Sequence, residues 1–146
     1  MNFLVIGDVV GRTGRTALKE NLKKIQDQFK ISFTIINAEN SAGGYGLTGK
    51  IYEELISWGA DAITLGNHAW DKREMLTFIE ECPNIIRAIN YPSGVPGRGS
   101  FKLELLNGKR IVIVQVMLRL FMGMSLDDPF KAINIFLSSE KLGSTC

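Results

Sequence analysis

The sequence predicts an α/β fold: a mostly parallel sheet flanked by helices, followed by an antiparallel hairpin. Short apolar runs alternate with amphipathic stretches over the first 90 residues. This pattern predicts four strands with a helix between each strand and the next. Strands joined through helices lie parallel in one sheet. After residue 100 the apolar residues alternate on both sides of Asn107-Gly108, which is a strong type I′ turn signal. With 146 residues, we expect residues 1–146 to form a single domain.

The first two strands frame a long helix. Residues 3–6 are a short apolar run ending at Gly7-Asp8, as expected of a buried strand. From about residue 15 to residue 29, apolar side chains recur three and four residues apart, which predicts a helix. Residues 31–36 are β-branched and aromatic and predict the second strand, which leads into a loop rich in Asn, Gly and Ser over residues 37–46.

The remaining elements carry their own start and stop signals. A second helix is expected to begin with Thr48 as N-cap and to end at Gly59. Residues 62–65 form a third strand, Asp71 is expected to open a helix that stops before Pro83, and residues 85–88 form a fourth strand. Residues 101–105 and 111–114 are the two hairpin strands. A short helix is then expected to start at residues 127–129, with Pro129 near its first position.

Composition and charge exclude several classes of protein. A net charge of +2, without a run of basic residues, gives no strong nucleic-acid signal. The most apolar late stretch, residues 111–124, is interrupted by polar residues and is too short to span a bilayer, so we expect no membrane partner. Asp8 comes too early for a secretory signal peptide, and Cys82 and Cys146 form neither a metal-ligand spacing nor a disulfide framework. We therefore expect a cytoplasmic protein with reduced thiols.

Polar residues follow three successive strands at the point where each strand ends. They are Asp8 after the first strand, Glu39 and Asn40 after the second, and Asn67 and His68 after the third. The carboxyl ends of neighbouring parallel strands meet at one crevice, where ligands bind. Oxygen donors together with a nitrogen ligand suit Mn²⁺, Fe, Mg²⁺ or Zn²⁺, and a cation would neutralise two carboxylates that otherwise repel each other. The pattern therefore favours a metal site.

Other interpretations of these residues compete with the metal site. Each of the five taken alone is typical of a cap, a turn or a loop. The spacing of Gly7, Gly11 and Gly14 departs from that of a dinucleotide-binding loop, and Asp8 within it would repel a pyrophosphate. Residues 44–51 nearly match a P-loop, but Ile51 stands where that motif needs a Mg²⁺-binding Ser or Thr. The coincidence at three strand ends favours the metal site over these alternatives.

Four segments carry a family resemblance. They are residues 7–11 (Gly-Asp-Val-Val-Gly), 37–40 (Asn-Ala-Glu-Asn), 66–68 (Gly-Asn-His) and 71–72 (Asp-Lys). In this order they resemble the YmdB-type phosphodiesterases, a branch of the calcineurin-like metallophosphoesterases. The likeness extends through residues 90–92, the hairpin and residues 126–130. It implies the N-terminal half of that family's sandwich of two sheets between helices.

The resemblance also implies a role for each residue. Asp8 would bind one metal, Glu39 would bridge two, Asn40 would ligate the first and Asn67 the second. His68 would be the general acid that protonates the leaving oxygen. The implied cofactors are two divalent metal ions, iron or manganese ahead of magnesium or zinc. The implied substrates are small phosphodiesters, namely cyclic nucleotides such as 2′,3′-cyclic AMP.

The chain also departs from the family. The resemblance implies three further histidine ligands, in Phe-His-Ala-Glu and Gly-Thr-His-Thr-His segments, whereas this sequence has only His68. We therefore expect a C-terminally truncated, incomplete metallophosphoesterase domain, impaired in activity, with an exposed apolar sheet face and an open sheet edge that favour a homo-oligomer. The alternatives are a non-catalytic metal- or nucleotide-binding fragment and a purely structural interaction module.

Overall fold

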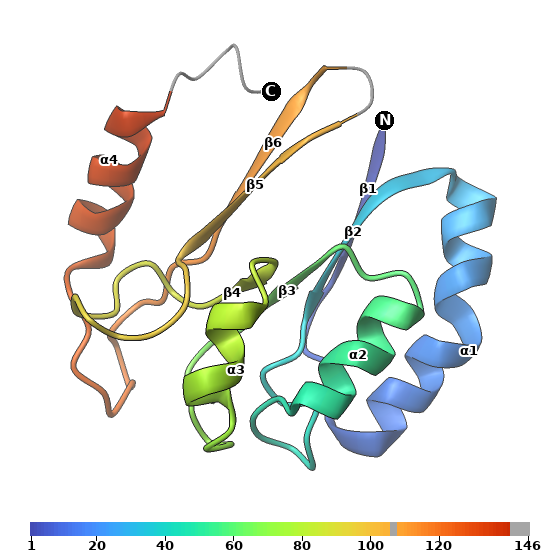
Figure 1. Cartoon of the computed structure of the whole chain (residues 1–146), viewed down its shortest axis with the longest axis horizontal. Coiled ribbons are helices and arrows are strands. Elements are labelled where there is room, and N and C mark those ends of the chain that lie inside the picture. The colour runs from blue at the N-terminus through green and yellow to red at the C-terminus, as the bar shows by residue number, and fades with distance from the viewer. Residues whose placement is uncertain (106–107, 141–146) are drawn as a thin grey trace.

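The structure is a computed structural model that describes residues 1–105 and 108–140. Helices and strands alternate along its first part, and a hairpin and a last helix follow (Figure 1). The elements, in chain order, are β1 (Asn2–Ile6), α1 (Gly11–Phe29), β2 (Ile31–Asn37), α2 (Gly49–Ser57), β3 (Ala62–Thr64), α3 (Met75–Glu81), β4 (Ile85–Ile86), β5 (Ser100–Glu104), β6 (Arg110–Val114) and α4 (Pro129–Ser139).

The predicted α/β architecture is confirmed. β1, β2, β3 and β4 form one sheet in sequence order, and every neighbouring pair is parallel. β5 and β6 pair antiparallel, as the alternation around residues 107–108 predicted. A parallel bridge between Ile86 and Arg98 links the sheet to the segment leading into the hairpin. Because consecutive strands are neighbours and parallel, their carboxyl ends lie side by side at one edge of the sheet.

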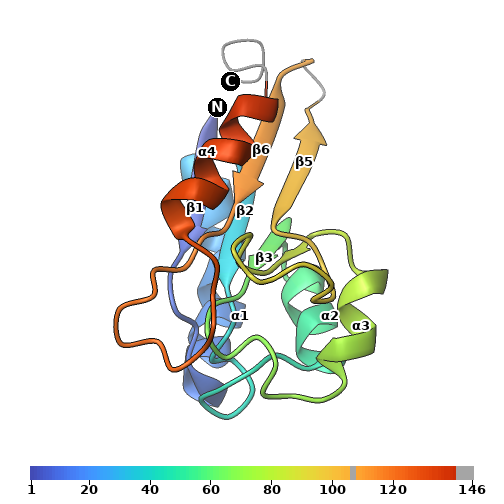
Figure 2. The ribbon, with the colours of Figure 1, turned by 90° about the vertical axis from the view of Figure 1, so that its left-hand side faces the viewer.

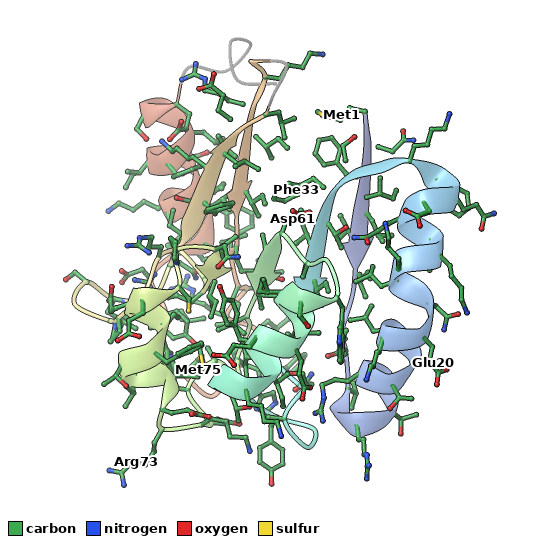
Figure 3. All side chains as sticks on the ribbon, turned by 45° about the vertical axis from the view of Figure 1, so that its right-hand side comes forward. Met1, Glu20, Phe33, Asp61, Arg73 and Met75 are labelled. Atoms are coloured by element: carbon green, nitrogen blue, oxygen red, sulfur yellow. The ribbon has the colours of Figure 1, made fainter. Side chains whose placement is uncertain are left out.

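The main core lies between the sheet and the first three helices. Leu22 of α1, Leu55 of α2 and Met75 of α3 are buried in one cluster with Ile36 and Ile63 of the sheet. The three helices therefore cover the same face. Met75 lies on the inner side of α3, whereas Glu20 points outward from α1 (Figure 3). This packing fixes the strands and, with them, the loops that follow their ends.

The hairpin covers part of the opposite face. Phe33, Ala62 and Ile86 of the sheet form a second cluster with Ile113 of β6. α4 lies at the far end of the molecule from α1, and its last turn is tied to β5 by the ion pair of Lys102 and Glu140 (Figures 1 and 2).

Two predicted helix starts were wrong, each by four residues. α1 begins at Gly11 instead of residue 15, because its first turn carries no apolar side chain and so shows no periodicity. Gly11 has a φ of 56°, and its N–H donates to the Asn40 carbonyl at 2.9 Å. α3 begins at Met75 instead of Asp71. The Asp71 side chain contacts His68 instead of capping a helix.

Other element ends agree with their sequence signals. Thr48 caps α2, accepting a hydrogen bond from the Ile51 N–H at 3.3 Å, and the helix gives way to Gly59 at a φ of 109°. Asp128 caps α4, with Pro129 at its first position. β3 and β4 are shorter than predicted. Asn107 of the predicted hairpin turn lies outside the described residues, as does Cys146.

One edge and part of one face of the sheet are open within the described residues. β1 pairs with β2 on one side only, and its Val5 side chain is 68% exposed. A hollow of about 430 Å³ separates β1 from α1 and is lined mainly by apolar side chains. On α4, Phe130 and Ile135 are 70% and 62% exposed. In the part of the chain that the structure describes, no helix is long and apolar enough to cross a bilayer.

Candidate metal centre

Three loops meet at the carboxyl ends of β1, β2 and β3, and backbone hydrogen bonds join them. The Val9 N–H donates to the Asn37 carbonyl at 3.1 Å, which ties the loop after β1 to the end of β2. The Ala38 N–H donates to the Thr64 carbonyl at 3.1 Å, which ties the loop after β2 to β3. Asp8 directly precedes the first of these contacts and Glu39 directly follows the second, so the sheet holds both residues at fixed places.

The structure brings Asp8 and Asn40 together. The Asn40 Nδ2 amide donates to Asp8 Oδ1 at 2.7 Å. Asp8 is exposed, whereas the Asn40 side-chain oxygen, Oδ1, is buried and has no hydrogen-bond partner among the described residues. The hydrogen bond fixes which end of the carboxamide faces Asp8, so the acceptor end is left for another partner. A buried acceptor without a donor calls for a water or an ion.

Glu39 spans the second and third loops. Its Oε2 accepts a hydrogen bond from the His68 backbone N–H at 3.3 Å. Its carboxylate lies so close to Gly66 that a Cβ at that position would collide with both oxygens. The absence of a side chain at Gly66 is therefore what makes room for the Glu39 carboxylate. This places the Glu39 carboxylate between the loop after β2 and the loop after β3.

Asn67 and His68 follow β3, and both are half-buried. Within the described residues the Asn67 side chain has no hydrogen-bond partner. The His68 ring is held by Asp71, whose Oδ2 lies 2.6 Å from Nδ1. A carboxylate can only accept, so this contact puts the ring proton on Nδ1 and leaves Nε2 free to act. The predicted residues thus form two contacting groups, Asp8 with Asn40 and Glu39 with the backbone of His68.

The donor set can be tested against a metal. Two carboxylates and two carboxamides are hard oxygen donors, and the unpartnered oxygen of Asn40 is the atom that a cation would satisfy. Among the described residues, however, no group of three or more His, Cys, Asp or Glu side chains comes together. His68 is the one histidine of the sequence. These donors therefore fit part of the shell of a divalent ion, and they leave positions that further ligands would have to fill.

Residues beyond the five predicted ones surround this centre. Asp71 was predicted only to open a helix, although its spacing of three residues from His68 was a signal for the pair. Burial raises the pKa of Tyr91, and the charges of Glu39 and Asp71 raise it further, whereas a hydrogen bond to Trp70 and the Arg87 charge lower it. Tyr91 therefore lies within electrostatic reach of both carboxylates.

Tyr45 and Lys72 form a further pair that the sequence did not indicate. The Tyr45 ring centroid lies 6.4 Å from that of His68. The Lys72 ammonium lies 4.6 Å from the centroid of the Tyr45 ring. An isolated exposed tyrosine in a glycine-rich loop gives no sequence signal, so only the folded loop could bring it beside His68.

Comparison with known proteins shows the family of the chain. The family described as YmdB-like protein matches residues 4–145. A Bacillus subtilis (strain 168) protein named 2′,3′-cyclic-nucleotide 2′-phosphodiesterase is 50% identical over 142 residues, which are 97% of this chain and 53% of that protein. The chain spans about half the length of the curated relatives it matches.

Two solved structures share the fold of the chain. A hypothetical protein from Thermus thermophilus matches with a TM-score of 0.89 and 42% identity, over 97% of this chain and 54% of that one. A structure described as a novel phosphatase, from Mycoplasma pneumoniae, matches with a TM-score of 0.86 and 29% identity, over 94% of this chain and 51% of that one.

Proposed function

This chain belongs to the YmdB-like protein family, and from that premise we propose that it carries the front half of a dinuclear, metal-dependent phosphodiesterase site. Its substrates are small phosphodiesters, cyclic nucleotides such as 2′,3′-cyclic AMP among them. The observation that carries the proposal is at Asn40, whose amide donates to Asp8 while its buried Oδ1 is left without a donor. Asp8 and the unpartnered oxygen of Asn40 are therefore the two donors that we propose for a cation.

The proposed ligands divide between two ions. Asp8 and Asn40 would hold the first, Asn67 would hold the second, and Glu39 would bridge them. A bound pair of divalent ions, iron or manganese ahead of magnesium or zinc, supplies a nucleophile from water at neutral pH and neutralises the charge of the phosphodiester. The chain itself supplies the ligand oxygens on loops that the sheet holds in place. The loops therefore need little rearrangement when substrate binds.

His68 is the proposed general acid. Asp71 holds its Nδ1 at 2.6 Å, and the Glu39 carboxylate accepts from its backbone N–H. Both contacts restrain the residue. A ring protonated on both nitrogens would keep its Nδ1 proton on Asp71, give its Nε2 proton to the leaving oxygen and become the neutral Nδ1–H form. The proton transferred is replaced from solvent, because the His68 side chain is only half-buried.

The proposal is tested by supplying these 146 residues with Mn²⁺ or Fe²⁺ and 2′,3′-cyclic AMP, beside the B. subtilis relative. We expect turnover far below that of the relative, because the chain offers oxygen donors and no imidazole besides His68. Mn²⁺ binding should nevertheless be measurable, and Glu39→Gln should weaken it while Glu20→Gln, on the outer side of α1, should not. Equal Mn²⁺ affinity in both variants would contradict the site.

A second candidate function is a non-catalytic metal- or nucleotide-binding fragment. It is favoured by the finding that the described residues bring no three His, Cys, Asp or Glu side chains together. The two candidates differ in one measurement. Nucleotide binding that survives both a chelator and Glu39→Gln would support the fragment, whereas binding lost with the metal would support the phosphodiesterase site.

We also propose a domain organisation, a mode of self-association and a cellular location. Residues 1–146 form a single, incomplete metallophosphoesterase domain, and the open edge of β1 makes self-association the expected consequence. Exposed Phe3 and Val5 on that strand, and the apolar hollow beside α1, support this. We place the protein in the cytoplasm, on the sequence argument alone, without a membrane or nucleic-acid partner.

A further inference from the structure

We infer that Tyr45 and Lys72 form a subsite that holds the base of a nucleotide beside the candidate metal centre. The inference deepens the proposed function and rests on it for the position of the phosphodiester. The residues concerned belong to the loop after β2 and to the turn that precedes α3. Neither is among the proposed metal ligands.

Tyr45 offers an open aromatic surface next to the centre. Its side chain is 54% exposed, and its ring centroid lies 6.4 Å from that of His68. An exposed aromatic ring next to a reactive group is a stacking platform, because every nucleobase presents a flat π-face. Sugars and simple alkyl esters present no such face, so the ring selects nucleotides among phosphodiesters.

The loop that carries Tyr45 is held by the same residues that form the centre. The Gly44 N–H donates to the Asn40 carbonyl at 3.2 Å, and the Gly46 N–H donates to the Glu39 carbonyl. The fully buried Ser41 hydroxyl donates to the Ala38 carbonyl at 2.8 Å. The ring is therefore preorganised relative to Glu39 and Asn40, which lowers the entropy cost of using it for binding.

Lys72 supports the ring and adds a positive charge. Its ammonium lies 4.6 Å from the Tyr45 centroid, a cation–π contact. Its stem passes close over Gly46, where a Cβ would lie 2.7 Å from Lys72 Cγ. In the part of the chain that the structure describes, Lys72 has no ion-pair partner. It therefore positions Tyr45 and leaves a cation available to an anionic ligand.

An aromatic face and an unpaired cation beside a metal centre match one ligand class. A nucleotide brings a flat base for Tyr45 and a negatively charged phosphate for Lys72 and the metal. A phosphate ester without a base would satisfy only the second of these. Tyr45 is thus expected to act on affinity for nucleotides alone, whereas Lys72 is expected to act on affinity for any phosphate ester.

The test measures binding, not turnover, with Mn²⁺ present throughout. The probe is 3′-AMP, the product left when the 2′ bond of 2′,3′-cyclic AMP is opened, and ribose 5-phosphate is the probe without a base. Titration calorimetry should show that Tyr45→Ala weakens 3′-AMP binding about tenfold, the size of one lost base–aromatic stack. Tyr45→Phe should retain the affinity, and ribose 5-phosphate binding should not respond to either change.

Two further variants complete the design. Phe29→Ala is the matched control, because Phe29 is as exposed as Tyr45 (54%) but is the last residue of α1. This change should leave 3′-AMP binding unchanged. Lys72→Met keeps the stem over Gly46, removes the charge, and should weaken both probes. Equal 3′-AMP affinity in Tyr45→Ala and the unaltered chain, or no 3′-AMP binding at all, would overturn the subsite. Failure of the proposed function would be seen in a separate measurement, because Glu39→Gln would then leave the Mn²⁺ affinity unchanged.

Discussion

Asp71 Oδ2 lies 2.6 Å from His68 Nδ1, so a carboxylate three residues further along the chain orients the histidine ring at the candidate centre. The two side chains are exposed to similar degrees, 39% and 38%, and the contact lies in a turn, not in a helix. A surface pair of this kind adds little to stability. Its consequence is geometric: it decides which ring nitrogen is left to react.

Replacing Asp71 by Asn should change the tautomer of His68. With the carboxylate in place, the neutral ring carries its proton on Nδ1; a carboxamide can donate as well as accept, so it no longer enforces this state. Nitrogen-detected NMR of the neutral imidazole should show the Nδ1–H form in the unaltered chain and a substantial Nε2–H population in Asp71→Asn. An unaltered chain already in the Nε2–H form would contradict the orienting role.

Adding one methyl group at Gly66 should damage the metal centre. A Cβ there collides with both oxygens of the Glu39 carboxylate, so the carboxylate must move away from its place between the loops. We expect Gly66→Ala to weaken Mn²⁺ binding by about tenfold or more, the cost of disturbing a ligand's support. Gly7→Ala is the matched control, because its Cβ would meet no atom within 4 Å. Equal loss in both variants would show that Glu39 is not the cause.

The stability of the fold should fall at high pH through Tyr52. Burial, followed by the Cys82 side chain, raises the pKa of Tyr52 to about 12, while its hydrogen bond to Asn84 at 2.7 Å acts in the opposite sense. Since the folded pKa lies above the ordinary value of 10.0, this stabilisation is full below about pH 10 and is lost as the pH rises toward 12. Urea unfolding between about pH 8 and pH 11 should show a smaller decline in Tyr52→Phe. An identical decline in both proteins would exclude Tyr52 as its source.

The open edge of β1 should drive concentration-dependent association. Val5 is 68% exposed on a strand that lacks a second neighbour within the described residues, and a carboxylate there would have to be desolvated on pairing. Sedimentation velocity should show the mean mass of the unaltered chain rising with concentration, and Val5→Glu should suppress the rise. Gln28→Glu adds the same charge on α1 outside the apolar hollow and should leave association intact. An unaltered chain that stays monomeric at high concentration would refute this prediction.

Local patterns predicted the fold well because they record which side chains face a core. The apolar runs located β1 to β4, the cap Thr48 located the start of α2, and Pro129 located the start of α4. The two wrong starts have different causes. The first turn of α1 has no apolar residue. Asp71 is of a residue type that often caps helices, but its side chain contacts His68 instead. Apolar periodicity therefore could not locate either helix start.

The sequence by itself determined that Asp8, Glu39, Asn40, Asn67 and His68 follow three successive strands, because strand order and parallel crossovers are local consequences of apolar patterning. Only the tertiary structure decided how they pair. Packing of the loops turned the Asn40 amide onto Asp8, fitted the Glu39 carboxylate against Gly66, and brought Tyr45 over Lys72. Such contacts join residues far apart in the chain and depend on the shape of the backbone around them, which no spacing of residue types records.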